Sequence, residues 1–588
     1  MRFPLLLLVL ACTANAADAV RERAETDEII YFVLPDRFEN GNPANDRGGL
    51  KGDRLKHGFD PTSKAFYHGG DLQGLTARLD YIQALGATAV WLTPVFRNKP
   101  VQGGPGQESA GYHGYWITDF TSVDPHLGDE AQMQAFVRAA HARGMKVYLD
   151  IIANHTADVI AYRECPTDRC PYRSRAEYPY SRHGGLQGEP INEGFTGDNF
   201  EKLTRPDFAY TPYLPAGEER IKAPQWLNDP LLYHNRGNST FAGESSEMGD
   251  FVGLDDLMTE NPRVVQGMIE IYGGWIDRYG VDGFRIDTAR HVNAEFWQAF
   301  VPAMLQRAAA NGIPHFHIFG EVSTSDIDVA LLARYTRDAK LPAVLDFAFA
   351  SAVRATVAGN AGTDKLARLF ADDTLYADGE KTALQLPTFI SNHDAGRFGY
   401  YVRKERPQAS DDEVLKRVLL AHAMLFTLRG VPVVYYGDEQ GFVGTGGDQD
   451  ARQDMMTSRT ESYLADRSLG TRQSNFDLSH PIAQAIAKLS ALRRAHAALR
   501  SGRQVVRNYS DSPGLFAVSR LDPATGREIA IAFNTSLQPL TTTMEVAAGS
   551  RRFTALYGRC ESEVAAPGSY RVVLAPLDFV VCAAGDGT

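Results

Sequence analysis

Short apolar runs along the chain alternate with segments whose apolar residues recur at helical spacing. Eight runs rich in β-branched or aromatic residues are predicted strands: Ile29–Leu34, Ala89–Thr93, Val147–Ile152, Val281–Ile286, His317–Gly320, Val344–Phe349, Leu386–Ser391 and Val431–Tyr436. The predicted helices between them are Leu72–Leu85, Glu130–Arg143, Pro262–Tyr279, Ala294–Asn311 and Asp412–Leu428. This alternation predicts an α/β fold, a (β/α)8 TIM barrel. An open doubly wound sheet is the alternative, but no Gly-x-Gly-x-x-Gly turn follows the first strand.

Two regions depart from the alternation. Residues 155–257 are rich in Gly, Pro, Asn and aromatic residues with little periodicity. A structureless loop of that length is uncommon, so an inserted domain is predicted. From about residue 503, turn residues separate short strands, predicted at Gly514–Leu521, Glu528–Asn534, Thr541–Val546 and Tyr570–Leu574. The expected division is a signal peptide (1–16), a barrel (17–154 and 258–500), an inserted domain (155–257) and a C-terminal β-sandwich (501–588).

The N-terminus resembles an export signal. A basic start, an apolar run over Phe3–Ala11 and the small-x-small site Ala14-Asn15-Ala16 are typical of a cleaved signal peptide. Cleavage before Cys12 to give a lipoprotein is the alternative, although the preceding Val-Leu-Ala matches an acylation box poorly. No later stretch of 18 apolar residues is present, so no membrane span is expected. We therefore predict a periplasmic or secreted protein.

The remaining cysteines suggest disulfides. Cys165, Cys170, Cys560 and Cys582 follow the predicted signal peptide. An even number of cysteines in an exported protein favours disulfides, and pairing within each local unit is the economical arrangement. A metal site is the weaker alternative, because no second Cys/His pair lies near Cys165 and Cys170.

Composition narrows the class of partner. The chain has 588 residues, a formal net charge of −12 and 44% hydrophobic residues, which is ordinary for a globular protein. The acidic balance argues against nucleic acid and anionic lipid. A neutral or cationic partner, or a bound metal ion, agrees better with this charge.

Acidic residues follow several predicted strands. Asp287, Glu321 and Asp394 come at the ends of three different strands, and in a barrel such ends meet at the catalytic face. One such Asp could simply be a helix N-cap. Three carboxylates at one mouth are costly to desolvate, which favours a functional role.

Paired carboxylates without a nucleophilic Ser or Cys motif indicate glycoside hydrolysis. Arg285 precedes Asp287 by two residues on the same strand face and would keep it ionised. The apolar residues before Glu321 would raise its pKa for acid catalysis. His155 and His393 could donate hydrogen bonds to sugar hydroxyls.

These segments resemble the ordered motifs of the α-amylase family of glycoside hydrolases (family 13). The motifs are DIIANH (150–155), GFRID (283–287), FGE (319–321), FISNHD (389–394), GATAVWLTPV (86–95), YHGYW (112–116), LDDL (254–257) and GVPVVYYGDE (430–439). The resemblance covers nearly the whole mature chain. It implies that Asp287 is the nucleophile, Glu321 the acid/base, and Asp394 the carboxylate that binds and distorts the sugar.

The resemblance also implies sugar contacts and a retaining mechanism. The expected contact residues are Tyr115, Trp116, His155, Arg285, Arg290, His291 and His393. Two departures from the family pattern stand out. Arg290-His291 replaces the usual Lys-His, which puts one contact to the glucan in doubt. The Leu-Asp-Asp-Leu-Met segment lacks its usual final Asn, which leaves Asp256 as the expected calcium ligand there.

Calcium is the cofactor that the resemblance implies, at two places. Asn154, Asp256 and the carbonyl of His291 match the family site between barrel and inserted domain. The N-terminal candidates, which resemble a loop of cyclodextrin glucanotransferases, are Asn40, Asn42, Asn45, Asp46, Gly69 and Asp71. Oxygen donors without thiolates suit this hard cation. An ordinary Asn/Gly/Pro turn is the alternative for the N-terminal loop.

The favoured interpretation is an α-amylase that acts, as a monomer, on an α-glucan oligosaccharide or polysaccharide. Transglycosylation and hydrolysis of cyclodextrins are alternatives within the family. Cyclising members carry an aromatic residue at the centre of the cleft, whereas Val252 and Gly253 stand there in this chain. A catalytically inactive carbohydrate-binding barrel is the alternative from another class, and the intact carboxylate trio argues against it.

Overall fold

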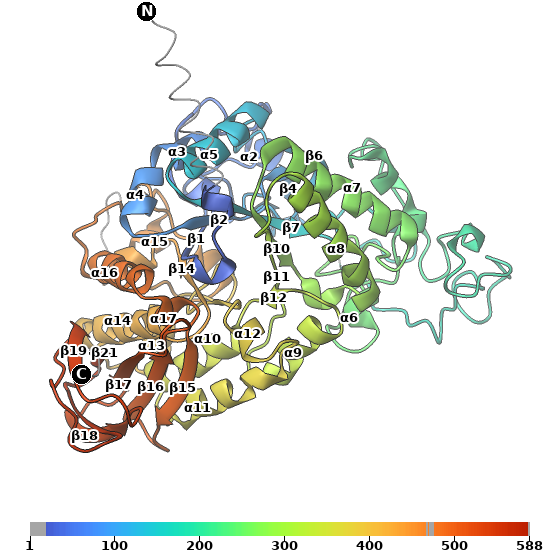
Figure 1. Ribbon diagram of the computed structural model, residues 1–588. Helices are drawn as coiled ribbons and strands as arrows, with labels where there is room; N and C mark the ends of the chain where they lie inside the picture. The colour runs from blue at the N-terminus through green and yellow to red at the C-terminus, as the bar shows by residue number, and fades with distance from the viewer. Residues whose placement is uncertain (1–18, 168, 466–468, 470–474, 586–588) are drawn as a thin grey trace, which may run out of the picture.

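The computed structural model describes residues 19–167, 169–465, 469 and 475–585. The predicted signal peptide and Cys12 lie outside these residues. Eight parallel strands occupy the centre of the molecule (Figure 1). They are β1 (Ile30–Val33), β2 (Ala89–Leu92), β7 (Lys146–Ile152), β10 (Gly283–Asp287), β11 (His317–Gly320), β12 (Ala343–Val344), β13 (Pro387–Thr388) and β14 (Val431–Tyr435).

The strands form a nearly closed barrel, as the sequence predicts. Their order is β12-β11-β10-β7-β2-β1-β14-β13. A parallel bridge between Asp346 and Thr388 joins the two ends, and the Asp346 amide donates to the Pro387 carbonyl at 2.9 Å. The barrel strands are buried throughout, which explains their continuous apolar runs.

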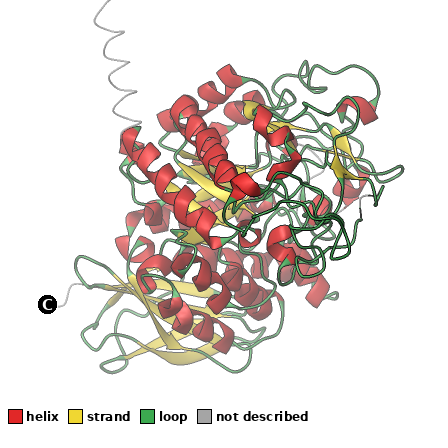
Figure 2. Ribbon diagram, turned by 90° about the vertical axis from the view of Figure 1, so that its right-hand side faces the viewer, coloured by secondary structure: helices red, strands yellow, loops and turns green. Residues whose placement is uncertain are grey.

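Helices surround the strands (Figure 2). The helix α7 (Pro262–Tyr279) has the predicted bounds because the Asn261 side chain caps it, proline begins it and the left-handed Gly280 ends it. The predicted helix Leu72–Leu85 is two helices, since Arg78 leaves the helical conformation. The other helices are α2 (Arg54–His57), α3 (Leu72–Ala77), α4 (Leu79–Ala84), α5 (Glu130–Ala142), α6 (Ser245–Met248), α8 (Ala294–Ala310), α9 (Val329–Arg337), α10 (Phe347–Val353), α11 (Asp364–Ala371), α12 (Glu380–Ala383), α13 (Phe398–Glu405), α14 (Asp411–Thr427), α15 (Glu461–Ala465), α16 (Pro481–Ala495) and α17 (Ala497–Arg500). None of the described helices is both long and apolar enough to span a bilayer.

Two predicted strands are too long. The run Val344–Phe349 contributes only its first residue to β12, because the Asp346 side chain accepts the Phe349 amide and begins α10. The run Leu386–Ser391 contributes only Pro387–Thr388. An apolar run fixes burial, but a capping side chain decides where the strand stops.

A long segment between β7 and β10 contains little regular structure and lies at the right of Figure 1. It contains the short antiparallel pair β8 (Ala161–Tyr162) and β9 (Pro212–Tyr213). Its predicted disulfide, Cys165–Cys170, is present. Four further strands lie between β2 and β7: β3 (Phe96–Asn98), β4 (Val101–Gln102), β5 (Ser109–Ala110) and β6 (Ile117–Val123). β3 pairs with β6, and β4 pairs with β5.

The C-terminal part is all β, as predicted, and its strands pair antiparallel. The order of its larger sheet is β15-β16-β17-β21-β19, and β18 pairs with β20 beside it. The predictions missed β15, β19 and β21. The bounds are β15 (Arg503–Asn508), β16 (Leu515–Leu521), β17 (Glu528–Asn534), β18 (Leu540–Glu545), β19 (Phe553–Tyr557), β20 (Ser569–Leu574) and β21 (Phe579–Ala584). The predicted Cys560–Cys582 disulfide is present.

This sheet packs directly on the barrel helices. Phe516, Ile531 and Phe533 belong to the same apolar core as the barrel, while the opposite sheet face packs on β18 and β20. The buried Arg520 guanidinium donates to the carbonyls of Thr427, at the end of α14, and Gly502. The barrel and the sheet therefore have a common interior.

Candidate active site

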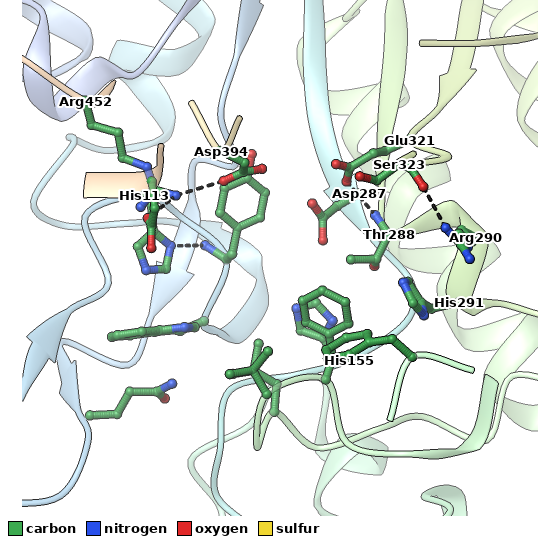
Figure 3. A pocket seen from close by; sticks show the side chains of 18 residues that line it. His113, His155, Asp287, Thr288, Arg290, His291, Glu321, Ser323, Asp394 and Arg452 are labelled. Carbon is green, nitrogen blue, oxygen red and sulfur yellow. Dashed lines mark hydrogen bonds and ion pairs between the residues drawn. The ribbon is translucent and has the colours of Figure 1, made fainter. Parts of the chain in front are cut away.

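The three predicted catalytic carboxylates line one cavity of about 550 Å³ at the carboxyl ends of the barrel strands. Asp287 is the last residue of β10, Glu321 directly follows β11, and Asp394 follows β13. Figure 3 shows Asp287 and Glu321 side by side, with Asp394 across the gap from them. The structure thus brings together residues far apart in the chain. Other predicted residues in the cavity wall are Tyr115, Trp116, His155, Arg290 and His291.

Arg285 joins two of the carboxylates beneath the cavity. Its Nη1 donates to Asp287 Oδ1 at 2.8 Å, and its Nη2 lies 2.7 Å from Glu321 Oε2. The side chain is 1% exposed. As predicted from the two-residue spacing, Arg285 and Asp287 project from the same face of β10. One guanidinium therefore fixes both acids.

Asp150 is a further member of this network, to which the sequence analysis gave no role. Its carboxylate accepts from Arg285 Nη1 at 2.8 and 2.9 Å, from the Tyr115 hydroxyl at 3.0 Å and from Trp91 Nε1 at 3.2 Å. Asp150 on β7 is the register partner of Arg285 on β10. That register is the signal from which the pair could have been predicted. Asp150 holds both Arg285 and Tyr115 in place.

Burial dominates the electrostatics of the two joined acids. It raises the pKa of Asp287 well above its ordinary value, with Arg285 opposing and Glu321 reinforcing the shift. The expectation that Arg285 keeps Asp287 ionised is therefore wrong for this cavity, because burial outweighs the charge of the guanidinium. Burial also raises the pKa of Glu321, again against Arg285. The Thr288 amide donates to Glu321 Oε2 at 3.2 Å. Two neighbouring buried carboxyls with one cation between them favour a state in which one acid keeps its proton.

Asp394 has the opposite electrostatic environment. Enclosure in the cavity would raise its pKa, but the contact with His393 Nε2 at 3.3 Å and the charges of Arg452 and Arg285 outweigh that effect and lower it. Arg452 Nη2 donates to Asp394 Oδ1 at 2.9 Å, and its Nε donates to the His393 carbonyl at 3.1 Å. Arg452 lies after β14 in a segment without a motif, so no local pattern predicted its role. Of the three predicted catalytic carboxylates, Asp394 is therefore the one most readily ionised.

His393 and Tyr115 support the floor of the cavity. The Tyr115 hydroxyl and His393 Nε2 are 2.8 Å apart, and their rings are stacked at a centroid distance of 5.4 Å. Burial lowers the pKa of His393 to about 3, so the imidazole is neutral near pH 7. His393 does not itself line the cavity, in contrast to the prediction of a direct sugar contact. It lies behind Tyr115 and Asp394 instead.

His155 lines the cavity beside the Tyr115 backbone, which opposes the effect of burial on its pKa. Burial lowers its pKa to about 3. The side-chain nitrogen Nδ2 of Asn154 lies 3.2 Å from His155 Nδ1. Since Asn154 Nδ2 can only donate, Nδ1 accepts and the proton of the neutral ring is on Nε2. His155 Nε2 is buried without a hydrogen-bond partner in the described structure. A ligand in the cavity could accept this hydrogen bond.

The remaining predicted contacts, Arg290 and His291, lie between Glu321 and the inserted segment (Figure 3). Arg290 Nη1 donates to the Ser323 carbonyl at 2.7 Å, and His291 Nδ1 lies 2.8 Å from the Ser246 carbonyl. Phe251, for which no role was predicted, stacks on His155 at a centroid distance of 5.7 Å. Val252 lines the cavity, as the comparison with cyclising enzymes implied. The further cavity-lining residues without a predicted role are Gln102, His113, Phe241, Leu254, Thr288, Ser323 and Asp448.

The N-terminal loop gathers most of the predicted metal-binding side chains. Asn40 Nδ2 donates to Asp46 Oδ1 at 2.8 Å, while Asn40 Oδ1 and Asn45 Oδ1 are buried without partners in the described structure. A Cβ on Gly69, whose φ is +94°, would lie 2.7 Å from Asn40 Nδ2 and Asp46 Oδ1. The Asp71 carboxylate accepts from the amides of Gly41, Asn42 and Gly74. Asn42 thus meets Asp71 through its backbone.

The second predicted metal set is less open. Asn154 and Asp256 lie on adjoining backbone segments, since the Leu257 amide donates to the Asn154 carbonyl at 2.9 Å. Asp256 Oδ2 is 2.6 Å from His234 Nδ1, and Glu260 is 3.0 Å from the other ring nitrogen. Burial raises the pKa of Asp256 to about 7, although His234 opposes the shift. Nothing in the described geometry joins the His291 carbonyl to this pair.

Comparisons place this architecture among known proteins. Residues 32–473 match the family described as "Alpha amylase, catalytic domain". An α-amylase of Streptomyces lividans is 44% identical over 556 residues, which are 93% of this chain and 59% of that protein. The chain thus spans about three fifths of the length of this relative.

Two solved structures are similar over almost the whole chain. The α-amylase of Geobacillus thermoleovorans complexed with acarbose has a TM-score of 0.66 and 27% identity, covering 96% of this chain and 100% of that one. CldA, described as a cyclomaltodextrin glucanotransferase with a three-domain ABC distribution, has a TM-score of 0.71 and 25% identity, covering 95% and 99%.

Proposed function

Because the chain belongs to the α-amylase family of glycoside hydrolases, we propose that it is a retaining hydrolase of internal α-1,4-glucosidic bonds in starch and maltodextrins. The observation that carries the proposal is the pair of buried acids, Asp287 and Glu321, held by one guanidinium at the cavity. Two adjacent carboxyl groups suit the double displacement of retaining glycosidases.

The proposed reaction has two steps. Asp287 attacks the anomeric carbon while the bond to the leaving sugar breaks, and Glu321 gives its proton to the leaving oxygen. Water then attacks the anomeric carbon of the glycosyl-enzyme, the bond to Asp287 breaks, and Glu321 accepts a proton from the water. The α configuration is kept because inversion occurs twice. The raised pKa of Glu321 favours its protonated form, which the first step needs as the general acid.

The other cavity residues would bind and orient the sugar. Asp394, kept ionised by Arg452, would accept hydrogen bonds from sugar hydroxyls. The free Nε2 of His155 would donate one. The Tyr115 ring would stack on the sugar face. Trp116, Arg290 and His291 would contact neighbouring sugar units, whereas Arg285 and His393 would act from beneath, by holding the acids and Tyr115.

Glucan transfer is the second candidate function, and the likeness to the glucanotransferase CldA favours it. Val252 argues against cyclisation. It is 73% exposed at the cavity wall and presents no aromatic ring around which a glucan could curl. An inactive binding barrel is the least favoured, since all three acids line the cavity.

Product analysis tests the proposal. Soluble starch, a maltodextrin, a cyclodextrin and pullulan should be incubated separately with the full chain, and the products separated by chromatography. We expect linear maltooligosaccharides from starch and maltodextrin, released with the α configuration by NMR. Mostly cyclic products from starch would support transfer instead, and no cleavage of any of the four would reject the proposal.

We also propose that the N-terminal loop binds calcium. The oxygen donors of Asn40, Asn45 and Asp46, two of them buried without partners, suit a hard cation, and Gly69 leaves room beside them. When bound, the ion would supply positive charge that holds the loop together. The set Asn154, Asp256 and His291 fits less well, because His234 already occupies one Asp256 oxygen.

Removal of calcium should lower thermal stability. We expect a chelator to lower Tm by about 2 °C, the scale for losing a ligand present at roughly 100 times its Kd from a chain of this length. Asn45→Ala should shrink this difference between calcium and chelator, because it removes one unpartnered oxygen. Asp256→Asn is the matched comparison at the other set. An unchanged difference in Asn45→Ala, with loss of the difference in Asp256→Asn, would move calcium to the second set.

We also propose that the protein is exported to the periplasm or the medium. Two disulfides, Cys165–Cys170 and Cys560–Cys582, support an oxidising location.

A further inference from the structure

Thr288, directly after Asp287, has an unusual backbone conformation. Its φ of 47° and ψ of 32° lie in the left-handed region. That region is rarely occupied by β-branched residues, and strained residues of this kind concentrate at functional sites. The left-handed conformation of Thr288 therefore indicates a functional role for this residue.

The conformation places two groups of Thr288 at the reacting centre. Its amide donates to Glu321 Oε2 at 3.2 Å. Its side chain lines the same cavity as Asp287 and Glu321 (Figure 3). Thr288 is only 6% exposed. Its Oγ1 is buried and has no hydrogen-bond partner in the described structure. A buried hydroxyl without a partner is costly unless a ligand or water satisfies it.

We infer that the Thr288 hydroxyl binds the water molecule that hydrolyses the glycosyl-enzyme. This inference rests on the proposed function and adds a residue that directs the second step toward water. The attacking water would give one proton to Glu321 while the water oxygen forms a bond to the anomeric carbon. The electron pair of the broken ester bond returns to Asp287. The second proton stays on the water oxygen, as the hydrogen of the new sugar hydroxyl, and makes a hydrogen bond to Thr288 Oγ1.

This arrangement discriminates between water and a sugar acceptor. Water has two protons and can donate to Glu321 and Thr288 at once. A sugar hydroxyl has only one proton, and Glu321 takes it during transfer. The Thr288 oxygen would therefore stabilise the approach of water more than the approach of a sugar. The residue would act as a determinant of hydrolysis against transglycosylation.

Two substitutions separate the hydroxyl from the shape of Thr288. Thr288→Val keeps the β-branch, and hence the same backbone restriction, but replaces the hydroxyl by a methyl group. Thr288→Ser keeps the hydroxyl and removes the methyl group. Equal Tm values for the two variants and the parent chain would establish that all three fold alike.

The readout is the ratio of transfer to hydrolysis with maltopentaose, measured from the longer and shorter products at one substrate concentration. We expect the ratio to rise about fivefold in Thr288→Val, the scale of one lost hydrogen bond, and to stay within about twofold in Thr288→Ser. An unchanged ratio in Thr288→Val would overturn the inference, and so would an equal rise in both variants. If the parent chain cleaves no α-glucan, the proposed function fails first and the inference fails with it.

Discussion

Replacing Asp287 by asparagine should lower kcat for maltopentaose hydrolysis by at least about 10⁴-fold, the scale on which loss of a nucleophile acts. The amide cannot form the ester intermediate of the proposed mechanism. Its oxygen can still accept from Arg285 Nη1, which now contacts Asp287 Oδ1 at 2.8 Å. Binding of maltopentaose, measured by calorimetry, should therefore change far less than kcat.

Asp448→Asn is the matched control for this substitution. Asp448 also lines the cavity and pairs with an arginine, Arg452, at 2.7 Å, but it is remote from Arg285 in the hydrogen-bond network. We expect its kcat to fall by less than about tenfold, as for loss of an exposed ion pair. Comparable losses in the two variants would show that Asp287 has been given the wrong role.

Glu321→Gln should reduce kcat on maltopentaose by about 10²- to 10⁴-fold, the usual contribution of a general acid and base. The loss should depend on the leaving group. A maltosyl fluoride needs no proton for departure, so its first turnover should remain fast and release one fluoride per enzyme. Without the base, the second step is slow, and the glycosyl-enzyme should accumulate on the peptide that contains Asp287. Mass spectrometry of the quenched enzyme would detect it.

The pH profile provides a separate control on Glu321. Burial raises its pKa against the opposing charge of Arg285, so the protonated form persists above the ordinary range for Glu. As pH rises through this raised pKa, the acid is lost and kcat/KM on maltopentaose should fall. Glutamine does not titrate, so the fall should be absent from the residual maltopentaose hydrolysis of the Glu321→Gln variant. The same alkaline fall in that variant would assign the acid to another group.

The sequence predicted elements best where one signal acts alone. The apolar runs at β11 and β17 have the predicted bounds because nothing nearby competes with strand pairing. The run after β12 failed because Asp346 caps a helix within it. β15, with the sequence RQVVRN, was missed because it lies in an antiparallel sheet and mixes polar with apolar positions. Burial could be predicted, but the competition between a cap and a strand could not.

The site residues at strand ends could be predicted from the sequence, and those in irregular segments could not. Residues at strand ends, such as Asp287 and Glu321, follow from topology because barrel strands deliver their carboxyl ends to one face. Arg452 and Phe251 come from irregular segments, and their approach to the cavity depends on chain folding that no local pattern encodes. Thr288 directly follows the GFRID motif, but only its left-handed backbone distinguishes it.

The common interior of barrel and C-terminal sheet limits how such a chain can be recombined. Phe516, Ile531 and Phe533 fill the barrel side of the sheet, and Arg520 satisfies carbonyls of both parts. A graft that exchanged the sheet for another would have to match this surface residue by residue, since a poor match would bury a cation without its acceptors. The exposed outer edge near Val573, on β20, carries no such requirement. Sequence drift and fusion partners should therefore be tolerated on that outer side, while the inner side changes together with α14.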